Sequence, residues 1–229
     1  LGHNVISLSD RDIINSSKSF RDPSGAKYLN NLISETITNF NPDLLILGHA
    51  DKVDKQMLLG ARAKKKHLTI SQWFLDPLTK KGPDYIKNKS RILDKLDAMD
   101  ASFTTTDPKS LDFKINNSFY MPNPCDQSLD NLKNFSHNPK NDIFYAISHG
   151  VHRGVLRTGK KDEREIFITK LKQKCKNVIF DTYGMFGKQP IWGENFLTKL
   201  SNSKMGLNLS RGKPIKYYSS DRITQIIGN

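Results

Sequence analysis

Short apolar runs alternate with longer amphipathic segments along most of this 229-residue chain. This alternation constrains the fold more than any other feature, because it is typical of strands and helices that build a parallel sheet. In the first half, the expected strands are residues 4–9, 43–47, 68–74 and 102–106. The sequence therefore predicts an α/β fold.

Amphipathic segments between these runs predict helices at 26–40, 55–66 and 84–96. Asn41-Pro42 should end the first of them, because the residue before a proline is pushed out of the α region. One stripe at helical spacing runs along that helix and should face a core: Leu29, Leu32, Ile33, Thr36 and Ile37.

The composition changes after Met121-Pro122-Asn123-Pro124, where a polar and weakly periodic stretch begins. We therefore expect a first domain at 1–124, a linker at 125–140 and a second domain at 141–229. In the second domain, strands are expected at 143–148, 177–181 and 205–210, and helices at 162–174 and 221–227. Ser219 or Ser220 should cap the last helix.

Composition limits the classes of partner. The formal charge of +13, of which +9 comes from residues 141–229, favours anionic ligands. No nucleic-acid recognition motif accompanies it, and the Lys64–Lys66 run is that of a solvated helix face, so no specific nucleic-acid partner is expected. No apolar run approaches the ~20 residues of a membrane span. Cys125 and Cys175 suit neither a disulfide framework nor zinc, which favours a reducing cytoplasm.

A basic, glycine-containing loop at 148–161 connects a predicted strand to a predicted helix. Glycine allows the backbone to approach a ligand, and cations beside a helix N-terminus suit a diphosphate. The residues expected to bind it are Gly150, Arg153, Arg157 and Lys160. The alternative is an ordinary solvated basic loop. The spacing fits neither a Walker A loop nor the dinucleotide fingerprint, so both of those classes are excluded.

A second polar cluster follows the strand expected at 205–210 and includes Asn208, Ser210, Asp221 and Arg222. The carboxyl edge of a parallel sheet is where open α/β folds bind ligands. Asp221 could instead only stabilise a helix N-terminus. A cation such as Arg222 is unfavourable at that position, so an anionic ligand would explain it.

His49 and Asp76 each follow a predicted strand of the first domain. A neutral imidazole at a sheet edge could take a proton from a hydroxyl, and so could an exposed carboxylate. The alternative for His49 is a packing or capping role. No spacing of metal ligands and no nucleophile motif is present, so we expect neither a metal nor another cofactor.

Four segments together resemble GT-B glycosyltransferases, most closely group 1 transferases of the spore-maturation (CgeB-like) type. Asn41-Pro42-Asp43-Leu44-Leu45-Ile46 resembles a recurrent strand of that family, and Met121-Pro122-Asn123-Pro124-Cys125-Asp126 resembles its crossover. The stretch from Lys204 to Ser210, through Asp221-Arg222, is similar to its donor-side segment. The opening Leu1-Gly2-His3-Asn4-Val5 is similar to the end of the family's first helix and its second strand. That similarity implies that an earlier strand and helix are missing.

The resemblance implies two Rossmann-like parallel-sheet domains, incomplete at both ends, with a nucleotide-sugar donor on the second domain and an acceptor on the first. The implied activity is hexosyl transfer to a cell-envelope glycan or lipid-linked acceptor, in polysaccharide biosynthesis, in the cytoplasm and peripheral to the inner membrane face. Gln225 stands where the family often has Glu, and it could bond a ribose hydroxyl without carrying charge. That departure supports an alternative, a noncatalytic nucleotide- or glycan-binding module.

Overall fold

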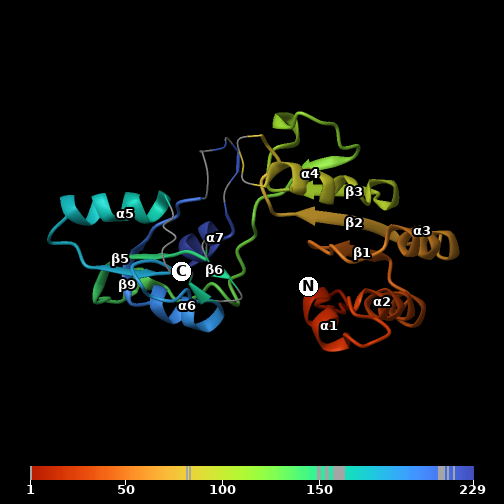
Figure 1. Ribbon diagram of the computed structural model, residues 1–229, viewed down its shortest axis with the longest axis horizontal. Coiled ribbons are helices and arrows are strands. Elements are labelled where there is room, and N and C mark those ends of the chain that lie inside the picture. The colour runs from red at the N-terminus through yellow and green to blue at the C-terminus, as the bar shows by residue number, and fades with distance from the viewer. Residues whose placement is uncertain are drawn as a thin grey trace. The chain divides into compact units, whose positions relative to one another are not determined.

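The computed structural model describes residues 2–80, 82, 84–148, 151–152, 155–156, 163–210, 215, 217–218 and 220–229. It divides into two compact units (Figure 1). The first comprises Leu1–Pro122 with Ile215–Tyr218, and the second comprises Asn123–Pro214 with Ser219–Asn229.

The first unit is an α/β unit around a four-stranded parallel sheet of order β1-β2-β3-β4. Its elements in chain order are α1 (Asp10–Ser17), α2 (Ala26–Phe40), β1 (Leu44–Leu47), α3 (Lys55–Lys64), β2 (Thr69–Phe74), α4 (Tyr85–Leu93), η1 (Leu96–Ala98), β3 (Ala101–Thr104), η2 (Pro108–Ser110) and β4 (Ser118–Tyr120).

The core of the first unit forms where α2 and α3 pack on the sheet. Leu29, Ile33 and Ile37 of the predicted stripe are buried there, beside Leu58 and Ile70. Asn41 ends α2 in the left-handed conformation, with its N–H donating to the carbonyl of Ile37. Asn tolerates that conformation better than most residues do, so the predicted end of the helix is confirmed.

The expected strand at 4–9 is wrong. This stretch forms no ladder with any strand that the structure describes, and its side chains Val5 and Ile6 are 76% and 49% exposed. A β segment depends on a hydrogen-bonded neighbour, and β1 pairs only with β2 here. Further along, α1 and β4 are elements that the pattern did not predict.

The second unit is also α/β, with a three-stranded parallel sheet of order β8-β5-β9. Its elements are η3 (Asn134–Ser136), β5 (Asn141–Ala146), β6 (Val151–His152), β7 (Val155–Leu156), α5 (Glu163–Lys174), β8 (Phe180–Tyr183), α6 (Gly193–Leu200), β9 (Ser203–Gly206) and α7 (Arg222–Gly228). The predicted α/β class with two parallel sheets is therefore confirmed.

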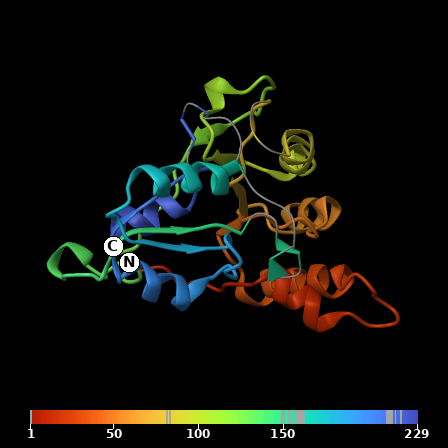
Figure 2. The ribbon, with the colours of Figure 1, turned by 60° about the vertical axis from the view of Figure 1, so that its left-hand side comes forward.

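Helices cover both faces of this second sheet. Phe144 packs on α6 through Phe196 and Leu200, whereas Tyr145 belongs to the core that Ile168 of α5 completes. Figures 1 and 2 show α5 and α6 on opposite sides of the strands. The alternation of residues 144 and 145 between the two cores is the period of two expected for a strand.

Residues 125–140, expected to be a linker, lie within the second unit. Leu132 packs against one of its cores, and Asn134 donates from Nδ2 to the carbonyls of Leu200 and Ser203. The side chain of Asn229 accepts from the backbone N–H of Leu132, which ties this stretch to the end of α7.

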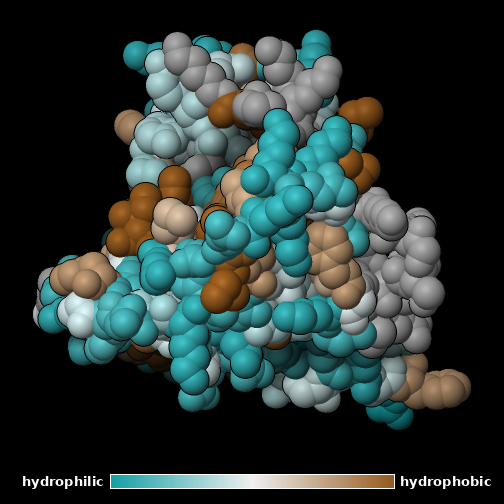
Figure 3. Space-filling model, turned by 90° about the vertical axis from the view of Figure 1, so that its left-hand side faces the viewer, coloured by the Kyte–Doolittle hydropathy of each residue, from teal (hydrophilic) through white to brown (hydrophobic). Residues whose placement is uncertain are grey.

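One face of the molecule is mostly hydrophilic, and its hydrophobic side chains form separate groups (Figure 3). Scattered apolar side chains are normal on a protein surface. In the part of the chain that the structure describes, no helix is both long and apolar enough to span a bilayer.

Candidate functional site

The strand order of the second sheet reverses between β5 and β9. The chain passes from β5 to β8 on one side, then returns to place β9 on the other side of β5. Open α/β sheets bind ligands in the crevice outside the carboxyl ends of the strands at such a reversal. The segments that leave β5 and β9 are the two that contain most of the predicted donor-binding residues.

Three polar side chains meet just beyond β9. Ser220 donates from its hydroxyl to Oδ1 of Asn208 at 2.9 Å, and Arg222 donates from Nη1 to the same oxygen at 3.2 Å. Arg222 also donates to the carbonyl of Leu209 at 3.3 Å. Its guanidinium carbon lies 5.6 Å from the ring centre of Tyr145, a cation–π distance. Arg222 is thus held at the carboxyl edge of the sheet by partners from two segments, the loop after β9 and β5 itself.

Asp221 is the residue that caps α7. Its carboxylate accepts from the backbone N–H of Arg222 at 2.9 Å, whereas the Ser220 hydroxyl is directed to Asn208. The prediction of Ser220 as the cap is therefore wrong: α7 begins one residue later than that cap requires, and the capping side chain is that of Asp221. Ser219, the other predicted cap, lies outside the described residues.

The remaining donor-side predictions have different outcomes. Ser210 is half-buried in the β9 loop, and Gln225 lies half-buried on α7, where its carbonyl accepts from Nδ2 of Asn229. Four predicted residues, Gly150, Arg153, Arg157 and Lys160, lie outside the described part of the chain. Their roles stay predictions.

In the first unit, His49 and Asp76 follow β1 and β2, and the structure brings them together. Parallel neighbouring strands end at the same edge, and Nδ1 of His49 lies 3.9 Å from Oδ2 of Asp76. Arg91 of α4 joins them, because its Nη1 donates to Oδ2 of Asp76 at 3.0 Å and its Nη2 lies 3.0 Å from Nδ1 of His49.

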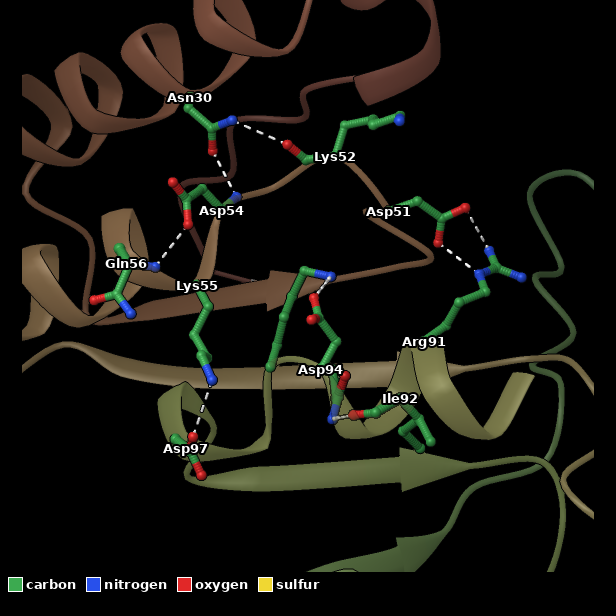
Figure 4. A network of polar contacts seen from close by, with 12 residues as sticks. Asn30, Asp51, Lys52, Asp54, Lys55, Gln56, Arg91, Ile92, Asp94 and Asp97 are labelled. Atoms are coloured by element: carbon green, nitrogen blue, oxygen red, sulfur yellow. Dashed lines mark hydrogen bonds and ion pairs between the residues drawn. The ribbon is translucent and has the colours of Figure 1, made fainter. Parts of the chain in front are cut away.

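Asp51 anchors Arg91 from the other side. Its two carboxylate oxygens accept from Nε and Nη2 of Arg91 at 2.7 and 2.8 Å, the bidentate arrangement shown in Figure 4. The ring of Phe74 packs against both His49 and Arg91, each at 5.6 Å. The Arg91 side chain is only 17% exposed, so charge-assisted bonds and an aromatic wall fix its position.

The β1–α3 loop that carries His49 and Asp51 is itself fastened to α2 (Figure 4). Asn30 donates to the carbonyl of Lys52 at 2.9 Å and accepts from the N–H of Asp54 at 2.7 Å. Asp54 then caps α3 by accepting from the N–H of Gln56. This chain of bonds sets the backbone position of the loop.

Sequence reasoning missed Arg91 and Asp51. Asp51 stands two residues after His49, and that proximity was the available signal for it. Arg91 is 40 residues from Asp51 and lies in a helix with two other basic residues, so nothing local distinguishes it.

An open depression of about 690 Å³ lies along the start of α4. Tyr85, one of its lining residues, donates its hydroxyl to Asp112, which raises the pKa of Tyr85 to about 12 and lowers that of Asp112. The lining residues are Lys80, Asp84, Tyr85, Ile86, Lys87, Ser90 and Arg91. The depression therefore has cationic groups and reaches the His49–Asp76 cluster through Arg91.

Within the described residues, no group of three or more His, Cys, Asp or Glu side chains is placed to hold a metal ion. In the cluster of the first unit, the guanidinium of Arg91 occupies the position between the carboxylates of Asp51 and Asp76.

Comparisons with known proteins provide little further information. No protein-family model matches the chain, and no curated protein is significantly similar to it in sequence. One solved structure to which the chain is similar is provisionally assigned as a UDP-N-acetylglucosamine 2-epimerase from Listeria monocytogenes, at 14% identity and a TM-score of 0.46. The match covers 80% of this chain and 56% of that one. Similarity of this extent assigns no activity to the protein.

Proposed function

We propose that the protein is a hexosyltransferase of the GT-B type, using a nucleotide-diphosphate sugar bound by the second unit. The observation that supports this most is the position of Arg222, Asn208 and Ser220 beside the reversal of strand order. In the sequence, the basic 148–161 segment follows β5, whose carboxyl end lies at the same edge as that of its parallel neighbour β9. A diphosphate between these two segments would meet cations from both.

In this proposal, the acceptor hydroxyl binds at the His49–Asp76 cluster of the first unit. During transfer, a bond forms between the acceptor oxygen and the anomeric carbon while the bond to the diphosphate breaks. A base of the cluster takes the hydroxyl proton, and Arg153, Lys160 and Arg222 neutralise the departing nucleoside diphosphate. This assignment of a base supposes inversion at the anomeric carbon.

The acceptor that we propose is a cell-envelope glycan or glycolipid, reached from the cytoplasmic side. The concentration of positive charge in residues 141–229 supports this, because cations attract an anionic membrane surface.

The first experiment is calorimetric titration of the protein with UDP-, GDP-, ADP-, dTDP- and CMP-sugars, with single-stranded DNA as a control for charge. We expect saturable binding of one nucleotide family that survives raised salt. Binding of DNA alone, lost as salt rises, would contradict the donor site. Donor binding without turnover of any acceptor would favour the noncatalytic binding module.

Variants then test the site. Arg222→Ala should weaken donor binding by about 1.5–3 kcal/mol, the range for hydrogen bonds to charged groups. Lys199→Ala, which removes a cation from α6 on the other face of the sheet, should leave it unchanged. Equal effects of the two substitutions on donor binding would mean that Arg222 contributes only through its charge and not through its position. Thermal unfolding of each variant checks that it folds.

The basic loop has its own test. Arg153→Ala and Lys160→Ala should each weaken binding of the nucleotide diphosphate by about 1–3 kcal/mol. Unchanged affinity in both variants would remove this loop from the proposed site.

A further inference from the structure

We propose that Arg91 holds His49 as the neutral tautomer protonated at Nε2, and so makes Asp76 the proton acceptor of the cluster. The tautomer follows from the hydrogen bonds of this unit alone. The role of Asp76 rests in addition on the proposed function.

The argument begins with the donors of Arg91. A guanidinium has five N–H groups and no lone pair to accept with. Four of the five are directed to Asp51, Asp76 and His49. The contact of 3.0 Å between Nη2 and Nδ1 of His49 is therefore a hydrogen bond that Nδ1 accepts. A nitrogen that accepts carries no proton, so the proton of the neutral ring is on Nε2.

The contact between Arg91 and His49 is held in place by neighbouring side chains. Asp51 holds the guanidinium through two parallel bonds, which fix its plane, and Phe74 lies against both the guanidinium and the imidazole. A proton on Nδ1 would point at the guanidinium and lose the bond.

The consequence is a division of roles. With its proton on Nε2, His49 offers a donor at the ring edge away from Arg91 and has no lone pair there to serve as a base. Both oxygens of Asp51 are taken by Arg91. In Asp76, Oδ2 binds Arg91, whereas no described residue bonds Oδ1.

Besides the fifth N–H of Arg91, the cluster thus retains one donor on His49, Nε2–H, and one acceptor oxygen, Oδ1 of Asp76. The two side chains are 23% and 42% exposed, so a ligand can reach them. A hydroxyl group both accepts and donates, and is complementary to this pair. The substrate group that the cluster is suited to bind is therefore an alcohol, which His49 orients and Asp76 deprotonates.

Nitrogen-15 NMR of the histidine-labelled full chain tests the tautomer, with His49→Gln used to assign the ring. We expect Nδ1 with the shift of an unprotonated nitrogen and Nε2 with that of a protonated one. Arg91→Gln should give a mixture of the two tautomers. Arg62→Gln removes a guanidinium that pairs with Asp100 instead, and should leave the His49 signals unchanged. A protonated Nδ1 in the parent chain, or no effect of Arg91→Gln, would overturn the inference.

Kinetics test the division of roles once a donor and an acceptor are known. Asp76→Asn should lower kcat by about 10²–10⁴-fold, the usual contribution of a general base. His49→Gln keeps an N–H donor and should cost only about tenfold, as for one hydrogen bond. The opposite order would make His49 the base and refute the proposal. Absence of donor binding contradicts the proposed transferase but not the tautomer, which the NMR experiment decides alone.

Discussion

Two glycines in the loop after β8 have nearly the same left-handed backbone but different surroundings. Gly184 has φ +75° and Gly187 has φ +76°. A Cβ on Gly184 would lie 1.8 Å from the carbonyl oxygen of Ile147, whereas a Cβ on Gly187 would meet nothing within 4 Å. The first glycine is required by the close approach of the chain after β5, and the second only by its own conformation.

This pair gives a matched prediction. Gly187→Ala should cost about 1–2 kcal/mol of unfolding free energy, the cost of a left-handed L-residue. Gly184→Ala should cost more than that, because the backbone of Ile147 must also move. Urea unfolding, followed by hydrogen exchange of peptides from the second unit, measures both. Equal losses of unfolding free energy in the two variants would mean that the backbone of Ile147 can move without cost.

The candidate site was predictable at the residue scale only in part. His49 and Asp76 could be found because each follows an apolar run, and the ends of parallel strands meet at one edge. Arg91 could not be found, because its role depends on how α4 packs against that edge and on Asp51, which is 40 residues away. The cap of α7 could not be assigned to Asp221 rather than Ser220 either, because the bond from Ser220 to Asn208 depends on how the loop after β9 packs.

At the scale of elements, Asn30 is the side chain that fastens α2 to the loop bearing His49. Asn30→Ala removes two hydrogen bonds that link distant segments and should lower the unfolding free energy by about 1–2 kcal/mol. The neighbouring Asn31 is exposed and bonds neither Lys52 nor Asp54, so Asn31→Ala should change it by less than about 0.5 kcal/mol. Equal urea midpoints for the two variants would contradict the fastening role.

Asp142 connects β5 to both neighbouring strands. Its Oδ2 accepts from the N–H of Ile179, just before β8, and its Oδ1 pairs with Lys204 of β9 at 2.9 Å. The bond from Ile179, and then Lys204, lower the pKa of Asp142 below its ordinary 3.8. A carboxyl whose pKa is lowered by folding adds stability above its unfolded pKa, and that stability is lost as the pH falls through the folded value.

Asp142→Asn should therefore reduce the loss of stability that the parent chain shows from about pH 5 downward. Urea midpoints at neutral pH and in acid measure that loss. Asp97 pairs with Lys55 and is 76% exposed, so Asp97→Asn should lose stability in acid as the parent does. If Asp142→Asn also follows the parent in acid, the carboxylate does not connect the strands as described.

At the scale of the whole molecule, periodicity predicted the α/β class and most helices and strands, because core packing follows the apolar stripes. It did not predict the fate of residues 4–9 or the packing of residues 125–140. The first depends on whether a neighbouring strand exists, and the second on polar bonds such as that of Asn134 to Leu200. Neither leaves a periodic signal.

The side chain of Asn229 links two segments of the second unit, so its removal should affect that unit alone. Besides Leu132, its side chain bonds the carboxylate of Asp130 at 3.0 Å and the carbonyl of Gln225 at 2.7 Å. Asn229→Ala should speed hydrogen exchange in residues 129–134 and in α7, with no change in the first unit. Asn131→Ala, which removes only a local bond to Ser128, is the control and should leave exchange in α7 unchanged. Faster hydrogen exchange in both units of Asn229→Ala would contradict this, because it would show that the two units unfold together.

The same asparagine bears on how the second unit folds. Its bonds to Leu132 and Asp130 span 97 and 99 residues of sequence. Closing a loop of that length costs entropy before any contact compensates for it, and topologies rich in such distant contacts fold slowly. The sheet β8-β5-β9 can form from nearer partners first. The stretch around Leu132 should therefore dock late, after the folding transition state, and changes at Asn229 should accelerate unfolding more than they slow folding.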